Sequence, residues 1–445
     1  MSTQNPASWK QLLRYVIPAA SAMVLFSLYT VIDGILVSHG VSETAMTAVN
    51  ISLPFINLLS GLSILLSMGA STLCAFALGR GDKERAEAIF TQTVVVMTVL
   101  SVLITVGVLF FAEDLAYLLG AGPHTVADAT AYLRIVSLFS VCFILSYCLE
   151  VMVKVDDSPI LATIGVGAAA IIHVVLAYVF IFHFHWGIRG SAIATGLAQL
   201  GSLLLFLHYF VHGKSDLKFR KFKWEPKLFL RILPLGVADC SIELMLGFLT
   251  VLYNNLLFLF FGESYQTIYA VIAYLSILVS MTMQGIAQGM MPLVSIAVGQ
   301  GDRRSIRFYI TKSVLLVLGT EVLIVAICQL VPGVFAGILL SPTSELYQPA
   351  ISALRQYSLS YLLAGVNILL AGYFAALGRG VASCVMSLCR GFVLLPGAIF
   401  AIAHIQPDGI WLAALLGEGL ALCLGLVLLK LTAKRPALSR AAQAA

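Results

Sequence analysis

The apolar positions of this chain fall into twelve long, continuous runs that short polar segments separate. Each run is at least about 20 residues long, which is the length that an α-helix needs to cross a bilayer. The runs lack the alternation of a membrane-spanning strand, so we expect helices throughout. The predicted spans are residues 12–38, 46–78, 88–112, 131–155, 160–183, 187–212, 228–262, 267–298, 305–335, 350–376, 380–404 and 408–431.

The composition supports this interpretation, because 60% of the 445 residues are hydrophobic and only 11% are charged. A soluble domain carries about a quarter charged residues. The first run is too long for the core of a cleavable signal peptide, so we expect it to remain in the membrane. All eight cysteines lie inside apolar runs, without the spacing of a metal or redox site. We therefore predict neither a metal nor another cofactor.

The basic residues are concentrated on alternate loops between the predicted spans. One set of loops carries nearly all of them, including six in the segment 212–227. The opposite loops are mainly acidic, and their few basic residues lie at or near helix starts. By the positive-inside rule, both termini are cytoplasmic, which agrees with an even number of spans. The net charge of +5 therefore reflects orientation in a membrane and does not indicate nucleic-acid binding.

Two polar loops, "ALGRGDKERA" at 77–86 and "AVGQGDRRSI" at 297–306, repeat one Gly-x-Gly-Asp pattern 220 residues apart. Each follows the second predicted span of its half of the chain. Pro18 and Pro234 occupy similar places in the first span of each half. We therefore predict a tandem repeat. Its parts are an N-terminal six-helix lobe (1–211), a basic cytoplasmic linker (212–227), a C-terminal six-helix lobe (228–431) and a cytoplasmic tail (432–445).

Because each half has an even number of spans, both halves start on the same side and the repeats are parallel. Such repeats are typical of secondary transporters, which hold substrate between two lobes. The Gly-Asp loops lack the Lys-Ser/Thr ending of a phosphate-binding loop, so transport must draw on an ion gradient. The acidic residues inside the spans are scattered along the chain and form no cluster, so no enzymatic activity is expected.

Several segments, taken in order, resemble the multidrug and toxic-compound extrusion (MATE) family, in particular its bacterial multidrug efflux branch. They are the two Gly-Asp loops, "VIDGILVSHGVSETAMTAVNISLP" (31–54), "WGIRGSAIAT" (186–195) and "SLCRGFVLLP" (387–396). The resemblance covers nearly the whole chain. It implies an all-α, V-shaped membrane protein with two pseudo-symmetric six-helix lobes. It also implies alternating-access export of organic, often cationic and amphipathic compounds from the cell, in exchange for H+ or Na+.

Asp33 is the strongest candidate for cation coupling. It lies inside the first span, 15 residues after Pro18, where a charged group is costly and usually functional. Apolar surroundings favour a neutral carboxyl, so Asp33 can bind and release a proton. Pro18 removes a helix hydrogen bond and supplies a bend point. The resemblance implies the same two roles, the coupling carboxylate for Asp33 and the helix bend for Pro18.

Asp239 and Glu243 lie one turn apart in the seventh span and therefore on one face. Two such carboxylates in a low dielectric would share a proton or a cation. The resemblance places Glu243 in the cavity of the C-terminal lobe. Aromatic, amide and thioether groups within the spans are suited to bulky cations. The candidates for lining the substrate cavity are Gln284, Asn50, Tyr147, Asn367 and Met283.

One position departs from the family pattern. Members that bind Na+ often carry Asn-x-x-x-Asp in the fifth span, whereas His173 and Ala177 stand here. Losing the aspartate removes a hard oxygen ligand, and an imidazole is a poor ligand for Na+. A histidine close to Asp33 could instead titrate with it. We therefore predict H+ coupling, with His173 among the coupling residues, and keep Na+ coupling as the alternative.

Arg390 lies well inside the eleventh span, where a guanidinium needs a carboxylate or carbonyl partner. Asp239, Glu243 and Glu418 are the candidates, and we predict a structural ion pair. A lipid-linked precursor flippase of the same superfamily is a further alternative. Such flippases often have fourteen helices and cavities rich in basic residues, whereas Arg390 is the only base clearly within a span here.

The expected partners are small organic substrates, the coupling ion and the lipid bilayer. The two halves form a pseudo-dimer whose cavity needs no second subunit, so we expect a monomer.

Overall fold

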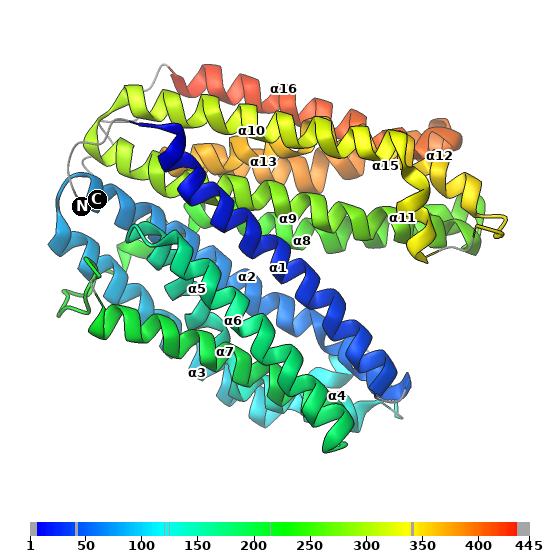
Figure 1. The fold of residues 1–445 in the computed structure, drawn as a ribbon, viewed down its shortest axis with the longest axis horizontal. Coiled ribbons are helices and arrows are strands. Elements are labelled where there is room, and N and C mark those ends of the chain that lie inside the picture. The colour runs from blue at the N-terminus through cyan, green and yellow to red at the C-terminus, as the bar shows by residue number, and fades with distance from the viewer. Residues whose placement is uncertain are drawn as a thin grey trace. The chain divides into compact units, whose positions relative to one another are not determined.

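The computed structural model describes residues 7–40, 43–119, 121–123, 125–213, 215–339 and 342–433. Side chains are described within these ranges except at 26–35, 37–40, 43–47, 50, 53, 246, 263–264, 270, 338–339 and 433. Every described element of secondary structure is a helix (Figure 1). The elements are α1 Trp9–Gly40, α2 Glu43–Gly79, α3 Lys83–Leu118, α4 Val126–Leu138, α5 Ser140–Val155, α6 Pro159–Tyr178, η1 Val179–His183, α7 Gly187–His212, α8 Lys227–Phe261, α9 Glu263–Gln300, α10 Arg303–Leu330, α11 Pro332–Leu339, α12 Tyr347–Ser358, α13 Tyr361–Ala376, α14 Gly380–Cys389, η2 Arg390–Leu394, α15 Leu395–Ile405, η3 Pro407–Leu412 and α16 Ala413–Ala433.

These helices account for all twelve predicted spans. Within the described residues, nine helices are long and apolar enough to cross a membrane, or up to eleven if each of two bent pairs is one span. The helix α1 covers the remaining predicted span, 12–38. The prediction of an all-helical, multi-pass membrane protein is confirmed.

Two of the spans are bent pairs of helices instead of single helices. The angle is 48° between α4 and α5 and 42° between α12 and α13. Shortly before each break, a serine hydroxyl donates to the carbonyl oxygen three residues earlier, from Ser137 to Arg134 at 2.8 Å and from Ser358 to Arg355 at 2.9 Å. A hydroxyl that bonds back onto its own helix competes with the backbone pattern and favours a bend.

The repeated Gly-Asp loops adopt the same turn in both halves. Gly81 and Gly301 have φ angles of +78° and +74°, a left-handed conformation that glycine adopts at little cost. The N–H groups of Asp82 and Asp302 donate to the carbonyl oxygen five residues earlier, at 2.9 Å in each loop, as in a Schellman cap. The Asp82 side chain then accepts one hydrogen bond, and the Asp302 side chain two, from N–H groups in the first turn of the next helix. The loop thus ends one helix and starts another.

By packing, the chain forms two compact units. The first comprises Ser21–Gly236, and the second comprises the described residues of Ser2–Ala20 and Val237–Ala445. These bounds differ from those predicted for the two lobes, 1–211 and 228–431. The reason is that the start of α1 and the start of α8 each pack into the unit formed mainly by the other half of the sequence.

Glycines let these exchanged segments approach neighbouring backbones closely. In the first unit, a Cβ atom at Gly236 of α8 would lie 1.8 Å from the carbonyl oxygen of Leu65 in α2. Gly69 of α2 lies on the same contact. In the second unit, a Cβ atom at Gly285 of α9 would lie 2.5 Å from the Cα atom of Ala20 in α1. Small residues allow such close helix packing within a membrane.

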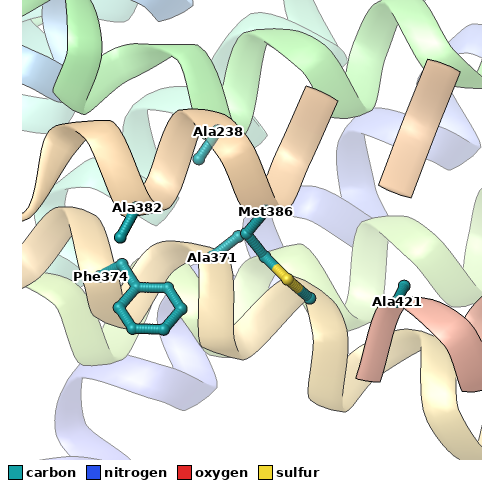
Figure 2. Close-up of a cluster of buried hydrophobic side chains, with 6 residues drawn as sticks. All are labelled: Ala238, Ala371, Phe374, Ala382, Met386 and Ala421. Carbon is teal, nitrogen blue, oxygen red and sulfur yellow. The ribbon is translucent and has the colours of Figure 1, made fainter. Parts of the chain in front are cut away.

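A core cluster of the second unit combines small residues with two large ones (Figure 2). Phe374 and Met386 are fully buried there, and alanines from neighbouring helices leave room for them. Methionine suits such a position because its flexible thioether fills irregular gaps. The members are Ala238, Ala371, Phe374, Ala382, Met386 and Ala421.

We expect Asp302→Ala to destabilise the protein by about 1 kcal/mol, because it removes the carboxylate that caps α10. Hydrogen bonds from the Ser305 side chain and from the N–H groups of Ser305 and Arg304 hold the pKa of Asp302 below its ordinary value. The contribution is therefore complete at neutral pH, and it is lost as the pH falls below the ordinary aspartate pKa and through the lowered one. Denaturant unfolding in detergent at neutral and acidic pH measures both effects. Asp302→Asn keeps the cap acceptor, so an equal loss in that control would contradict the capping role.

We expect Gly236→Ala to destabilise the protein by about 1–3 kcal/mol or more, because the new methyl group meets the α2 backbone. Gly247→Ala in the same helix is the matched control, since nothing lies within 4 Å of the place that its Cβ would occupy. Helix propensity predicts that this control is neutral or more stable than the parent. Thermal unfolding in detergent compares the two variants, and similar losses in both would contradict the close approach of α8 to α2.

Candidate functional site

A buried ion pair joins η2 and α16 in the second unit. Arg390 donates from Nε to Oε2 of Glu418 at 2.9 Å and from Nη2 to Oε1 at 2.7 Å. The two residues are 5% and 3% exposed. A bidentate pair of this geometry is among the stronger hydrogen-bonded ion pairs in proteins. The sequence left three carboxylates as possible partners of Arg390. The structure shows that the partner is Glu418.

Asn367 of α13 joins the same pair. Its Nδ2 donates to Oε2 of Glu418 at 2.7 Å and to the Glu418 carbonyl oxygen at 2.9 Å. Asn367 and Arg390 border a cavity of about 10 Å³, together with Ser387 and Met245. A polar cavity of that size holds about one water molecule. Asn367 was predicted to line a substrate cavity, and in this structure it is fully buried and links α13 to α16.

A second carboxylate, Glu321 of α10, lies nearby and is fully buried. Its Oε1 accepts a hydrogen bond from the N–H group of Gly365 at 2.6 Å. A Cβ atom at Gly365 would lie 2.5 Å from that oxygen and 2.8 Å from the Sδ atom of Met283, so glycine makes the contact possible. Within the described residues, the other oxygen of Glu321 has no hydrogen-bond partner. Met283, predicted as a cavity residue, packs at this contact.

The acidic pair of α8 keeps the spacing that the sequence predicted. Asp239 is 4% exposed, and its Oδ1 lies 3.5 Å from the Nε2 donor of Gln288 on α9. Glu243 follows one turn later and is half-buried. Gln284, one turn before Gln288, is buried as well. The sequence had not connected Gln288 with Asp239, although a buried amide on a neighbouring span requires a polar partner.

In the first unit, His173 of α6 is fully buried beside Thr195 of α7. The His173 Nε2 and Thr195 Oγ1 atoms are 3.1 Å apart, and the threonine hydroxyl donates to the Ser191 carbonyl oxygen at 2.9 Å. A hydroxyl has one proton to give, so the histidine is the donor in their contact and carries a proton on Nε2. Ala177, one turn after His173 on α6, is fully buried.

The remaining predicted residues lie in α1, α2 and α5. The side chains of Asp33 and Asn50 fall outside the described residues. Pro18 lies inside α1, and its role as a bend point stays a prediction. Tyr147 is half-buried on α5.

A buried ion pair on α5 was not predicted from the sequence. Lys154 Nζ lies 2.7 Å from Glu150 Oε1 on α5, and their side chains are 4% and 7% exposed. The four-residue spacing is the signal that could have revealed it, because residues so spaced are neighbours on a helix. Lys154 thus neutralises an acid that would otherwise stand alone at the end of a span.

Comparisons with known proteins agree on one family. The sequence profile of the MatE family matches residues 18–179 and 245–399. The multidrug export protein MepA of Staphylococcus aureus (strain bovine RF122 / ET3-1) is 22% identical over 416 residues, which are 93% of this chain and 91% of that protein. The protein of the same name from Staphylococcus saprophyticus is 24% identical over 408 residues, which are 88% of this chain and 87% of that protein.

Solved structures share the fold. The outward-facing conformation of a multidrug resistance MATE family transporter of the MOP superfamily superposes with a TM-score of 0.89 at 21% identity. The match covers 98% of this chain and 96% of the other. A MATE crystal structure in complex with MaL6 gives the same TM-score at 20% identity, over 98% of this chain and 97% of the other. Because the profile matches more than half of its residues, the chain belongs to the MatE family.

Proposed function

We propose that this protein exports organic, often cationic and amphipathic compounds across the cell membrane in exchange for H+. The family and the relatives named as multidrug export proteins support export of small molecules. The buried carboxylates of the second unit are the observation that favours H+ as the coupling ion. Asp239, Glu321 and Glu418 are each at most 4% exposed in its described spans, and Arg390 pairs with only one of them. A buried carboxylate within a span is usually functional, and Glu321, held by one hydrogen bond from a backbone N–H group, is suited to exchanging a proton.

The environment of His173 also favours H+ over Na+. A Na+ ion at this place would need the Thr195 hydroxyl oxygen as a ligand. That hydroxyl already donates its proton to Ser191 and accepts from the His173 ring, so only one of its two lone pairs is left for an ion. A protonated ring nitrogen beside it would repel a cation. Na+ coupling remains the alternative that the experiment below tests.

The mechanism that we propose is alternating access. The outward-open form takes up a proton at Asp33 or at the Asp239 and Glu243 face, and substrate leaves to the outside. The inward-open form releases the proton and binds the next substrate. Gln284, Tyr147 and Asn50 are proposed to contact substrate, and both termini are proposed to be cytoplasmic. The protein is proposed to act as a monomer.

A lipid-linked precursor flippase is less well supported. Such a protein needs free basic groups within the spans to hold a pyrophosphate. Arg390 is the basic residue that the sequence places clearly within a span. Glu418 accepts two hydrogen bonds from it, so its charge is already paired.

We expect an imposed pH gradient, and not a Na+ gradient, to drive a fluorescent cationic dye across liposomes that contain the protein. Asp33→Asn should reduce this movement to background, because it removes the titratable carboxyl group. Glu345→Gln is the control, because Glu345 is an exposed carboxylate in the segment before α12. Movement driven only by Na+ would overturn the proposed coupling, and no movement under either gradient would favour the flippase.

We expect Glu418→Leu to destabilise the protein by about 3–5 kcal/mol, because it leaves the Arg390 guanidinium buried without its partner. The double variant Arg390→Met/Glu418→Leu should recover most of that loss, since an apolar replacement of both partners removes the uncompensated charge. Denaturant unfolding in detergent measures the two values. Equal losses in the single and double variants would show that the pair is not the source of the stability.

A further inference from the structure

The segment 213–226, which joins α7 to α8, is fixed along the start of α3. The Arg85 guanidinium donates to both carboxylate oxygens of Glu225, at 2.6 and 2.9 Å. Gln92 donates to the Glu225 carbonyl oxygen at 2.8 Å and accepts from its N–H group at 3.3 Å. The N–H group of Arg220 donates to the Thr91 hydroxyl at 3.1 Å. The segment is therefore held along α3 by side chains of the first unit.

This attachment uses both acidic residues of the segment. Asp216 lies 3.2 Å from Lys83 Nζ, and Glu225 is bound by Arg85. The Arg85 guanidinium holds the pKa of Glu225 below its ordinary value, so this carboxylate stays ionised and engaged. Neither acid is left to neutralise the lysines of the same segment.

Three lysines, Lys218, Lys221 and Lys223, are exposed on the segment. None of them has an ion-pair partner within the part of the chain that the structure describes. The neighbouring Arg220 is engaged differently, since its guanidinium lies 2.9 Å from Glu84 and 3.5 Å from Glu87. The net positive charge of this surface therefore comes from the three lysines.

Aromatic residues alternate with these lysines. Phe219 is 41% exposed and Trp224 is 55% exposed, although both are large and apolar. The Phe219 ring is held against Phe90 of α3, with centroids 4.9 Å apart. Beside it lies an open depression of about 550 Å³, lined by Thr91, Phe219, Arg220, Lys221 and Phe222. Exposed aromatic rings among basic groups are typical of protein surfaces at a membrane interface.

The position in the chain places this surface at the bilayer. The segment links two spanning helices, α7 and α8, so it lies just outside the hydrocarbon region. It belongs to the set of loops that carries most of the basic residues. This is the side proposed to be cytoplasmic, and cytoplasmic leaflets carry anionic lipids, which attract clusters of lysine and arginine near the membrane surface.

We propose that residues 217–225 form a basic–aromatic strap that binds the phosphate headgroup of an anionic phospholipid. Lys221 lines the depression and would contact the phosphate, while Lys218 and Lys223 add positive charge around it. Phe219, Phe222 and Trp224 would contact the glycerol and the upper part of the acyl chains. This site is separate from the transport residues, so it does not depend on the coupling ion or the exported compound.

The test is lipid binding to the delipidated full-length protein in an uncharged detergent, counted by native mass spectrometry. Phosphatidylglycerol is the anionic probe, and phosphatidylcholine and inorganic phosphate are the comparison probes. We expect one tight phosphatidylglycerol site. The triple variant Lys218→Gln/Lys221→Gln/Lys223→Gln should weaken it by about 100-fold, from the usual contribution of three basic residues at an anionic membrane. Lys221→Glu alone should weaken it as well.

The matched control is Arg303→Gln/Arg304→Gln/Arg307→Gln. It also removes three exposed positive charges, but from the start of α10, outside the strap. Its affinity for phosphatidylglycerol should stay close to that of the parent. Equal weakening by both triple variants would overturn the proposal in favour of diffuse charge attraction. Equal binding of phosphatidylcholine would show that charge plays no part, and full displacement by inorganic phosphate at similar affinity would identify a free-anion site instead of a lipid site.

Discussion

Close backbone contact between helices is the constraint on which each unit depends. The start of α8 reaches the backbone of α2 only because Gly236 and Gly69 carry no side chains. The start of α1 meets α9 in the same way at Gly285. These contacts also set the surroundings of the buried polar groups, because Asp239 follows Gly236 by three residues and its partner Gln288 follows Gly285 by three. Any side chain added at these glycines would therefore disturb the polar groups as well as the packing.

The buried charges follow from the cost of leaving an ion without a partner in apolar surroundings. Arg390 donates two hydrogen bonds to Glu418, and Asn367 donates a third. Glu321 instead accepts a hydrogen bond from the backbone N–H group of Gly365 and has no basic side chain as its ion-pair partner within the described residues. A carboxyl with one backbone donor is held less firmly than one in a bidentate ion pair.

Much of the fold was readable from the sequence, because spanning helices need long apolar runs and the Gly-Asp pattern dictates a particular turn. The roles of Gly81 and Asp302 depend on neighbours within a few residues along the chain, so they can be predicted from the sequence. The partner of Arg390 could not be predicted in this way. Three carboxylates met the same chemical requirement, and only the three-dimensional structure shows that Glu418 is the one within hydrogen-bond distance. The exchange of the first turns of α1 and α8 was missed for a similar reason: hydropathy defines a helix but not which helices it touches.

The attachment of residues 213–226 to α3 changes where flexure can occur. A linker bound through Glu225 and Arg85 belongs to the first unit and is not a free tether. The chain passes from one unit to the other after Ala20 and after Gly236, in both cases inside a helix. Each crossing lies two residues beyond a proline, Pro18 or Pro234, where the helix already lacks one hydrogen bond. Each crossing is therefore a place inside a continuous helix where bending costs less than elsewhere in that helix.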